Sequence, residues 1–138
     1  MIYAVIDTNV LISAFFTSND ESPTVKIIDH IISENITPVY SDEILSEYLN
    51  VLSRKKFNFS PSEISYAIRI MNEKGIKIDA PHIEIDLPDY DDVIFYEIAL
   101  ESNRKNKTYL VTGNIKHFPK EHIVVTPREM MEIISEQL

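Results

Sequence analysis

Residues 2–16 read IYAVIDTNVLISAFF, an apolar run, one acid and a second apolar run. The run from Ile2 to Ile6 predicts a buried strand, because solid apolar strands are typical of parallel sheets covered on both faces. The stretch from Thr8 to Phe16 predicts a helix directly after that strand. Asp7 falls between the two, where it either N-caps the helix or takes part in chemistry at the end of the strand.

The same alternation of strand and helix continues along the chain. Further strands are predicted at 37–40, 109–111 and 123–125, with one or two short strands within 76–87. Helices are predicted over 22–33, 41–54, 60–75, 89–103 and 126–138. Capping residues support these bounds, with Ser41, Ser60 and Thr126 at helix starts and Gly75 at a helix end. The pattern predicts an α/β fold, a three-layer α/β/α sandwich with a central, mostly parallel sheet, formed by residues 1–138 as a single domain.

Composition excludes several classes of function. The 138 residues are 44% hydrophobic and 25% charged, and 13 Lys and Arg against 22 Asp and Glu give 13 − 22 = −9. This charge disfavours passive nucleic-acid binding and favours a divalent cation or a basic partner. The absence of cysteine excludes thiolate zinc sites and Cys nucleophiles, and the two glycines exclude Gly-rich phosphate loops. No apolar run or N-terminal pattern indicates a membrane span or a secretory signal, so a cytoplasmic protein is expected.

Acidic and polar residues fall where strands end or helices begin. Asp7 follows the first strand, Glu47 borders the apolar stripe of its helix, and the sequence VTGN at 111–114 follows another strand. The densest acidic stretch is DLPDYDD at 86–92. Each of these has an ordinary structural explanation by itself, but four acids within seven residues repel one another, and a bound cation would relieve that repulsion. Carboxylates with hydroxyl and amide neighbours form a hard oxygen site, which prefers Mg²⁺ or Mn²⁺ to zinc.

Four segments together resemble the PIN-domain family of metal-dependent ribonucleases. They occur in the family's order and approximate spacing and cover nearly the whole chain, at 5–13, 41–49, 91–99 and 110–114. The first and last segments are the more specific. The resemblance implies Asp7, Glu47 and Asp92 as the catalytic, metal-binding acids, with Asp91 as a neighbouring alternative to Asp92. Asn114 stands where many members have a fourth acid, so its amide is an expected metal neighbour that adds no charge, and the number of metal ions stays open.

Other residues take supporting roles in this hypothesis. Hydroxyl and amide groups near the acids are expected to orient the carboxylates, namely Thr8, Asn9, Ser13 and Thr112. Basic residues are expected to line the rim of an RNA site, namely Arg54, Lys55, Lys56, Arg104, Lys105, Lys107 and Lys116. Solubilising helix ends are the ordinary alternative for each of these basic residues.

The resemblance also implies a reaction and partners. The reaction is Mg²⁺- or Mn²⁺-assisted hydrolysis of RNA by a metal-activated water, and the closest similarity is to toxins of bacterial and archaeal toxin–antitoxin pairs. An antitoxin partner and a homodimer are therefore expected, and no membrane association. One alternative is a catalytically weakened PIN-like module that binds RNA or protein, which Asn114 supports. Another is a phosphatase of the haloacid-dehalogenase type with Asp7 as nucleophile, although Asn9 replaces the second acid of that family's D-x-D motif.

Overall fold

The computed structural model describes all residues from Met1 to Leu138. Its strands are β1 (Ile2–Ile6), β2 (Ile36–Tyr40), β3 (Ile76–Lys77), β4 (Thr108–Val111) and β5 (Val124–Val125). Its α-helices are α1 (Thr8–Phe16), α2 (Pro23–Ile32), α3 (Asp42–Leu52), α4 (Pro61–Lys74), α5 (Val93–Asn103) and α6 (Pro127–Gln137). Three short 3₁₀ helices complete it, η1 (Lys55–Phe57), η2 (Tyr90–Asp92) and η3 (Ile115–His117). None of the helices is long and apolar enough to cross a bilayer.

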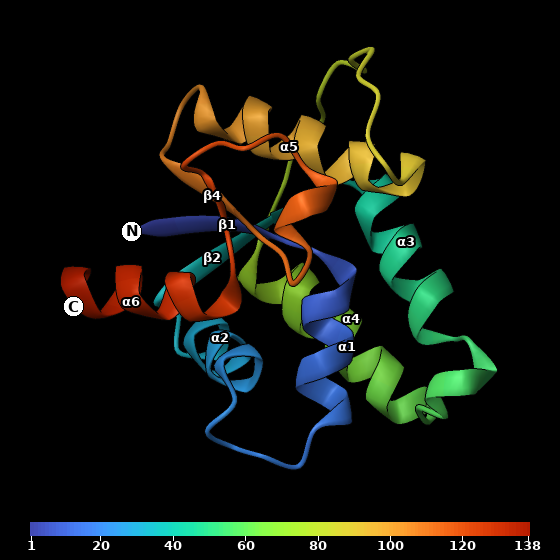
Figure 1. Ribbon diagram of the computed structural model, residues 1–138. Helices are drawn as coiled ribbons and strands as arrows, with labels where there is room; N and C mark the ends of the chain where they lie inside the picture. The colour runs from blue at the N-terminus through green and yellow to red at the C-terminus, as the bar shows by residue number, and fades with distance from the viewer.

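The strands form one sheet in the order β3-β2-β1-β4-β5, and every neighbouring pair is parallel. Helix α5 covers one face, and α1, α2, α4 and α6 lie on the other (Figure 1). This arrangement confirms the predicted three-layer α/β fold. The apolar runs explain it, because Ala4, Val5 and Ile6 of the central strand are all fully buried.

Local capping fixes several of the predicted helix starts. The Ser41 hydroxyl accepts a hydrogen bond from Ile44 N at 3.1 Å, at the start of α3. Ser60 and Glu63 form a reciprocal capping box at the start of α4, and Thr126 does the same with Glu129 at the start of α6. The helices therefore begin where the sequence signals placed them.

The region 76–87 contains one short strand, which agrees with the predicted one or two. Ile76 and Lys77 form β3, Ile78 N still donates to the carbonyl oxygen of Tyr40 in β2, and the chain from 79 to 89 forms no further strand. Pro81 and Pro88 have no N–H to give to a strand ladder, and Ile83 N donates to the Glu97 carboxylate instead. The predicted helix at 89–103 begins as the separate 3₁₀ turn η2.

Helix α3 lies beside the carboxyl end of β1, which matters for the site. It packs against α1, α4 and α5. The buried Tyr48 hydroxyl of α3 donates a hydrogen bond to the carbonyl oxygen of Ile6, the last residue of β1. Burial raises the pKa of Tyr48 well above its usual value, so the hydroxyl keeps its proton and remains a donor. Leu49, expected in the buried stripe of this helix, is instead 52% exposed.

Candidate metal-binding site

Acidic side chains from three parts of the chain line one cavity of about 190 Å³. The cavity lies where β1 leads into α1, beside α3 and the start of α5 (Figure 1). This is the carboxyl end of the parallel strands, the edge at which α/β folds bind ligands. Its acidic and amide residues are Asp7, Glu47, Asp89, Asp91, Asp92 and Asn114.

Asp7 is the most enclosed of these acids, at 4% exposure. Its Oδ1 accepts a hydrogen bond from Thr8 N at 2.8 Å, which caps α1. Its Oδ2 accepts from Asn9 Nδ2 at 3.0 Å and from Thr112 Oγ1 at 2.7 Å. Burial raises the pKa of Asp7, and the bonds from Thr112, Thr8 and Asn9 act in the opposite direction. The carboxylate is therefore held in one orientation by β4 and α1 together.

The turn after β4 is tied to the same point. Thr112 Oγ1 accepts from Asn114 N at 3.0 Å, and Asn9 Oδ1 accepts from Gly113 N at 2.9 Å. A Cβ at Gly113 would lie 3.2 Å from Asn9 Oδ1. A residue without a side chain at this position lets the turn approach the start of α1 closely, and this brings Asn114 to the cavity.

Asp92 stands at the start of α5, buried and close to Asp7. Burial, then the charges of Asp7 and Asp89, raises the pKa of Asp92 to about 6, while His117 acts in the opposite direction. Asp92 Oδ2 lies 3.1 Å from Nδ1 of His117. The sequence reasoning missed His117, although its position three residues after Asn114, just past a strand, is a signal that could have indicated it.

Glu47 approaches from the opposite side of the cavity, next to Tyr48 in α3. Burial and then the negative charge of Asp91 raise the pKa of Glu47, and Arg54 acts in the opposite direction. The charge of the exposed Asp91 acts on Glu47, and the charge of Asp7 acts on both Glu47 and Asp92. The two candidates for the third acid therefore occupy different surroundings, and Asp92 is the buried one.

These residues fit a hydrated hard cation. The possible metal ligands are all oxygens apart from His117. Burial raises the pKa of Asp7, and burial together with the charges of neighbouring acids raises the pKa of Glu47 and of Asp92. The Thr8 hydroxyl is the only buried side-chain polar atom without a hydrogen-bond partner, and Thr8 lines the cavity. No three acids or histidines lie close enough to hold one ion directly. Mg²⁺ keeps several waters and needs only one or two carboxylates, so a partly hydrated ion suits this donor set.

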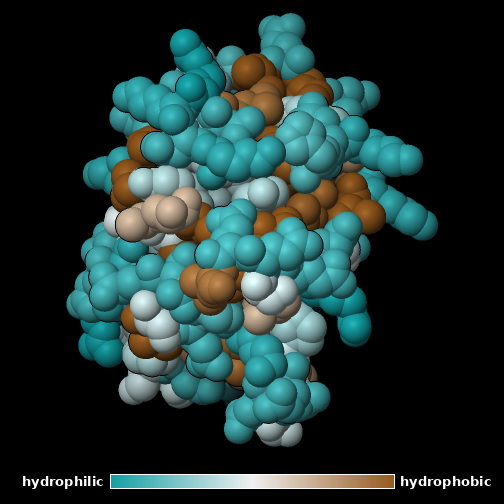
Figure 2. Space-filling view, turned by 90° about the vertical axis from the view of Figure 1, so that its left-hand side faces the viewer, coloured by the Kyte–Doolittle hydropathy of each residue, from teal (hydrophilic) through white to brown (hydrophobic).

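Some predicted positions lie away from the cavity. The Ser13 hydroxyl hydrogen-bonds with Thr24 Oγ1 at 3.1 Å and contacts none of the acids, because it lies further along α1. Arg104, Lys105 and Lys107 follow the far end of α5 and precede β4, so they lie at the amino end of the strands. Figure 2 views the molecule from that side, where the surface is largely hydrophilic. These three residues are solubilising groups opposite the cavity, which corrects their assignment to an RNA rim.

The remaining basic candidates lie nearer to the acids. Arg54 lines the cavity, and Lys55 and Lys56 follow it in η1. Lys116 lies in η3, between Asn114 and His117. The local chain geometry therefore supports these four as candidates for contact with a bound polyanion.

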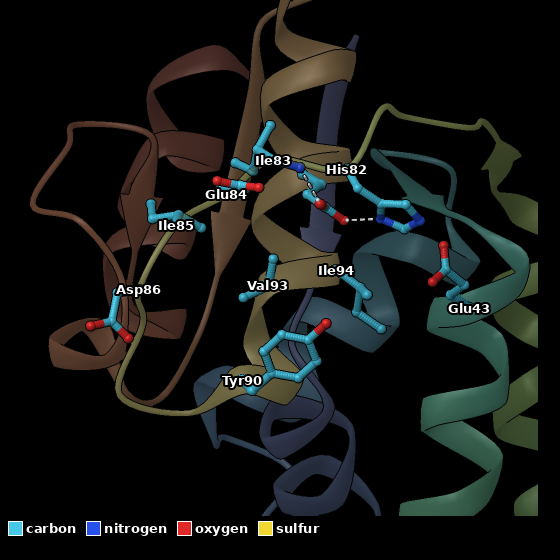
Figure 3. A pocket seen from close by; sticks show the side chains of 10 residues that line it. Glu43, His82, Ile83, Glu84, Ile85, Asp86, Tyr90, Val93 and Ile94 are labelled. Carbon is cyan, nitrogen blue, oxygen red and sulfur yellow. Dashed lines mark hydrogen bonds and ion pairs between the residues drawn. The ribbon is translucent and has the colours of Figure 1, made fainter.

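The largest cavity of the molecule is a different one, about 710 Å³, between the 82–86 segment and α5 (Figure 3). Its buried acid is Glu97, at 5% exposure. Glu97 accepts a hydrogen bond from Ile83 N at 2.7 Å and lies 3.3 Å from His82 Nδ1. Both carboxylate oxygens contact the 82–86 segment, so Glu97 holds that segment on α5.

A family profile described as PIN domain matches residues 3–116. The chain belongs to the PIN-domain family. Members of this family are generally nucleases. The matched range includes every acid of the cavity and Asn114, and it ends one residue before His117. Neither the comparison with curated proteins nor the comparison with solved structures finds a significant match.

Proposed function

We propose that this PIN-domain protein is a Mg²⁺- or Mn²⁺-dependent ribonuclease that hydrolyses RNA phosphodiesters at the acidic cavity. The observation that carries the proposal is the convergence of five carboxylates and one unpaired buried hydroxyl at the carboxyl end of the sheet. Folding alone gives no reason to bury acids whose charge is disfavoured there. Perturbed acids in a cavity are typical of functional sites.

The contacts of each residue indicate whether it binds the metal ion or positions another residue. Asp7 and Asp92 are the proposed direct ligands, with Glu47, Asp91 and Asn114 binding through water. A divalent ion in this position supplies an activated water and stabilises charge on the phosphodiester oxygens. Asn9 and Thr112 fix the Asp7 carboxylate, and His117 holds Asp92 by its Oδ2 atom. Without an ion the acidic floor repels RNA, so we expect substrate binding at the cavity to depend on metal.

RNA cleavage by the purified protein tests the proposal. We expect cleavage of a labelled RNA with Mn²⁺ or Mg²⁺ and none with EDTA, and a loss of at least about 100-fold in Asp7→Asn and in Asp92→Asn. Asp86→Asn is the matched control, because Asp86 belongs to the same acidic stretch but does not line the cavity. Equal cleavage by all four proteins would indicate a contaminating nuclease and end the proposal. Circular dichroism of each variant establishes that its fold is retained.

A catalytically weakened RNA- or protein-binding module is the second candidate. Two observations favour it, namely Asn114 in place of a fourth acid and the absence of a three-ligand cluster. The same assay separates the two, because this module would bind RNA without metal-dependent cleavage. The phosphatase alternative has less support, since Asn9 stands where the second acid of the D-x-D motif would be. A trapped phospho-enzyme would revive it.

The family resemblance supports three finer proposals. They are a role as the toxin of a toxin–antitoxin pair, a homodimer, and a cytoplasmic location. Co-expression with a small protein encoded next to this chain tests the first, with suppression of the RNA cleavage as the expected result. Analytical ultracentrifugation tests the second, and cell fractionation tests the third.

A further inference from the structure

Two groups of aromatic rings, one of three and one of two, lie beyond the acidic cavity on the end of α1, η1 and the first part of α4. Phe16 of α1 packs edge-on against Phe59, with ring centroids 6.2 Å apart, and Phe59 stacks on Phe57 at 6.0 Å. Asn58 between them has a left-handed backbone, with φ of 55°, which turns the chain sharply at this point. Phe15 packs edge-on against Tyr66 of α4 at 6.2 Å. We call these rings and their basic neighbours the aromatic–basic cluster.

Phe15 and Phe59 pack against the hydrophobic core, whereas two other rings of the cluster face solvent. Phe16 is 65% exposed and Tyr66 is 42% exposed, among the largest exposures of any aromatic side chain in the molecule. Basic groups lie over two of the rings, with Lys56 Nζ 5.1 Å from the centroid of Phe57 and Arg69 Cζ 5.6 Å from that of Tyr66. Rings exposed in a group and interleaved with cations are typical of surfaces that bind single-stranded nucleic acid.

The charge of this region is opposite to that of the whole chain. Residues 54–72 contain Arg54, Lys55, Lys56 and Arg69 against the single acid Glu63, so their net charge is 4 − 1 = +3, compared with −9 for the chain. A positive region of this size on an acidic protein is complementary to a polyanion. This charge favours an RNA strand over a second copy of this acidic chain.

The cluster is continuous with the acidic cavity along two helices. Ile12 lines the cavity, and Phe16 lies four residues further along α1, on the same helix face. Val51 and Arg54 line the cavity from α3, and η1 follows directly. Figure 1 shows α1 and α3 both running downward from the cavity toward the start of α4. A strand bound at the cluster would therefore pass Arg54 on its way to the acids.

We propose that the aromatic–basic cluster binds unpaired nucleotides of the RNA substrate and directs the strand into the acidic cavity. Bases stack on the exposed rings of Phe16 and Tyr66, while Lys56 and Arg69 contact phosphates. A base can stack in this way only when it is not paired in a duplex. The cluster therefore contacts an unpaired part of the substrate, and this inference rests on the proposed ribonuclease function.

Fluorescence anisotropy with a labelled oligouridylate of about 12 nucleotides tests the cluster. Single-strand-binding domains contact about 4–16 nucleotides, so this length is enough to cover the site. The buffer contains EDTA, so that binding is read without cleavage. We expect Phe16→Ala and Tyr66→Ala each to weaken binding about 5- to 20-fold, as loss of one stacked base does. We also expect an RNA duplex of the same length to bind the wild-type protein at least about 5-fold more weakly than the single strand.

Two lysines provide a matched comparison. Lys56 lies over Phe57 in the cluster, and Lys107 lies over Tyr109, 5.4 Å from its centroid, at the opposite end of the sheet. Lys56→Ala should weaken RNA binding and reduce the steepness of its salt dependence by about 0.7, as expected for one lost phosphate contact to a single strand. Lys107→Ala makes the same change in charge and should leave both quantities unaltered.

Unchanged affinity in Phe16→Ala and Tyr66→Ala would overturn the inference, as would equal effects of the two lysine variants. It would also fail if these ring variants changed the sedimentation of the protein but not its RNA affinity, since the cluster would then join two copies of the chain. Cleavage with Mn²⁺ separates this inference from the proposed function. If the ring variants cleave RNA and bind it as the wild type does, this inference fails and the proposed ribonuclease function stands. If the wild type binds RNA through the cluster but does not cleave it, the RNA-binding site is supported and the proposed ribonuclease function fails.

Discussion

Asp7 combines a structural and a proposed catalytic role in one side chain. Its Oδ1 caps α1 through Thr8 N, a contact that any N-cap acid makes. Its Oδ2 accepts hydrogen bonds from Asn9 and Thr112, and the latter connects α1 to the turn after β4. A cap needs no such enclosure, and burial raises the pKa of this carboxyl. The cap therefore explains the contact of Oδ1, and the burial of the carboxylate beside Asp92 is what the metal hypothesis explains.

The raised pKa of Asp92 predicts a dependence of stability on pH. In the folded protein it is about 6, against 3.8 for the unperturbed group, so the folded state holds the proton more tightly. The resulting stabilisation is complete below about pH 4 and is lost as the pH rises through 6. In metal-free buffer the melting temperature of Asp92→Asn should therefore fall less than that of the wild type between pH 4 and 7. Asp86→Asn should follow the wild type, and identical curves for all three proteins would contradict the assignment.

Thr8→Val tests the unpaired hydroxyl at the cavity. Valine keeps the shape of the side chain and removes a buried polar atom that has no partner. In EDTA we expect the free energy of unfolding to stay the same or to rise by about 1 kcal/mol. Mn²⁺ should raise the melting temperature of the wild type more than that of Thr8→Val, because the ion or its water loses one oxygen contact. An equal increase in both proteins would show that Thr8 does not face the ion.

At the scale of elements, Gly75 is required for the packing of α4 against β2. It ends α4 as predicted, with an extended backbone and φ of −103°. A Cβ at this position would lie 2.5 Å from the carbonyl oxygen of Met71 and 2.6 Å from that of Pro38. Both atoms belong to the backbone, so the end of α4 would have to move away from β2.

We predict that Gly75→Ala lowers the free energy of unfolding by about 1–3 kcal/mol, the usual cost of overpacking. Urea denaturation measures the change. Gly113→Ala is the comparison, because its Cβ would meet the side-chain oxygen of Asn9 at 3.2 Å, and its loss should be smaller. A larger loss in Gly113→Ala than in Gly75→Ala would show that the close approach at Gly75 is relieved without cost.

The elements themselves could be predicted from local signals, and their exceptions have local causes. Apolar runs and Ser or Thr caps placed the strands and most helix starts, since both act within a few residues. One short strand was predicted within 76–87, but its bounds could not be, because the path of the chain after it depends on Glu97, a residue of the later helix α5. Leu49 has the spacing of a buried residue but is 52% exposed, and it lines an open groove between α3 and α4.

At the scale of the molecule, the topology of the sheet determines which predicted residues meet. Asp7, Glu47 and Asp92 line one cavity because parallel strands place their carboxyl ends together and α5 begins there. The same rule places Lys107, just before β4, at the opposite end. His117 was missed because its contact with Asp92 joins residues 25 positions apart, and Ser13 was misplaced because residue spacing does not show which neighbour a hydroxyl faces.

A crystal of the protein soaked in Mn²⁺ gives the most direct test of the central claim, which is that the separated acids form one cation site. We predict an anomalous difference peak in the acidic cavity, at about 2.0–2.3 Å from a carboxylate oxygen of Asp7 or Asp92, with water completing the coordination. The peak should disappear in Asp92→Asn. A cavity that stays empty at saturating Mn²⁺, or a peak bound only at other residues, would contradict the account.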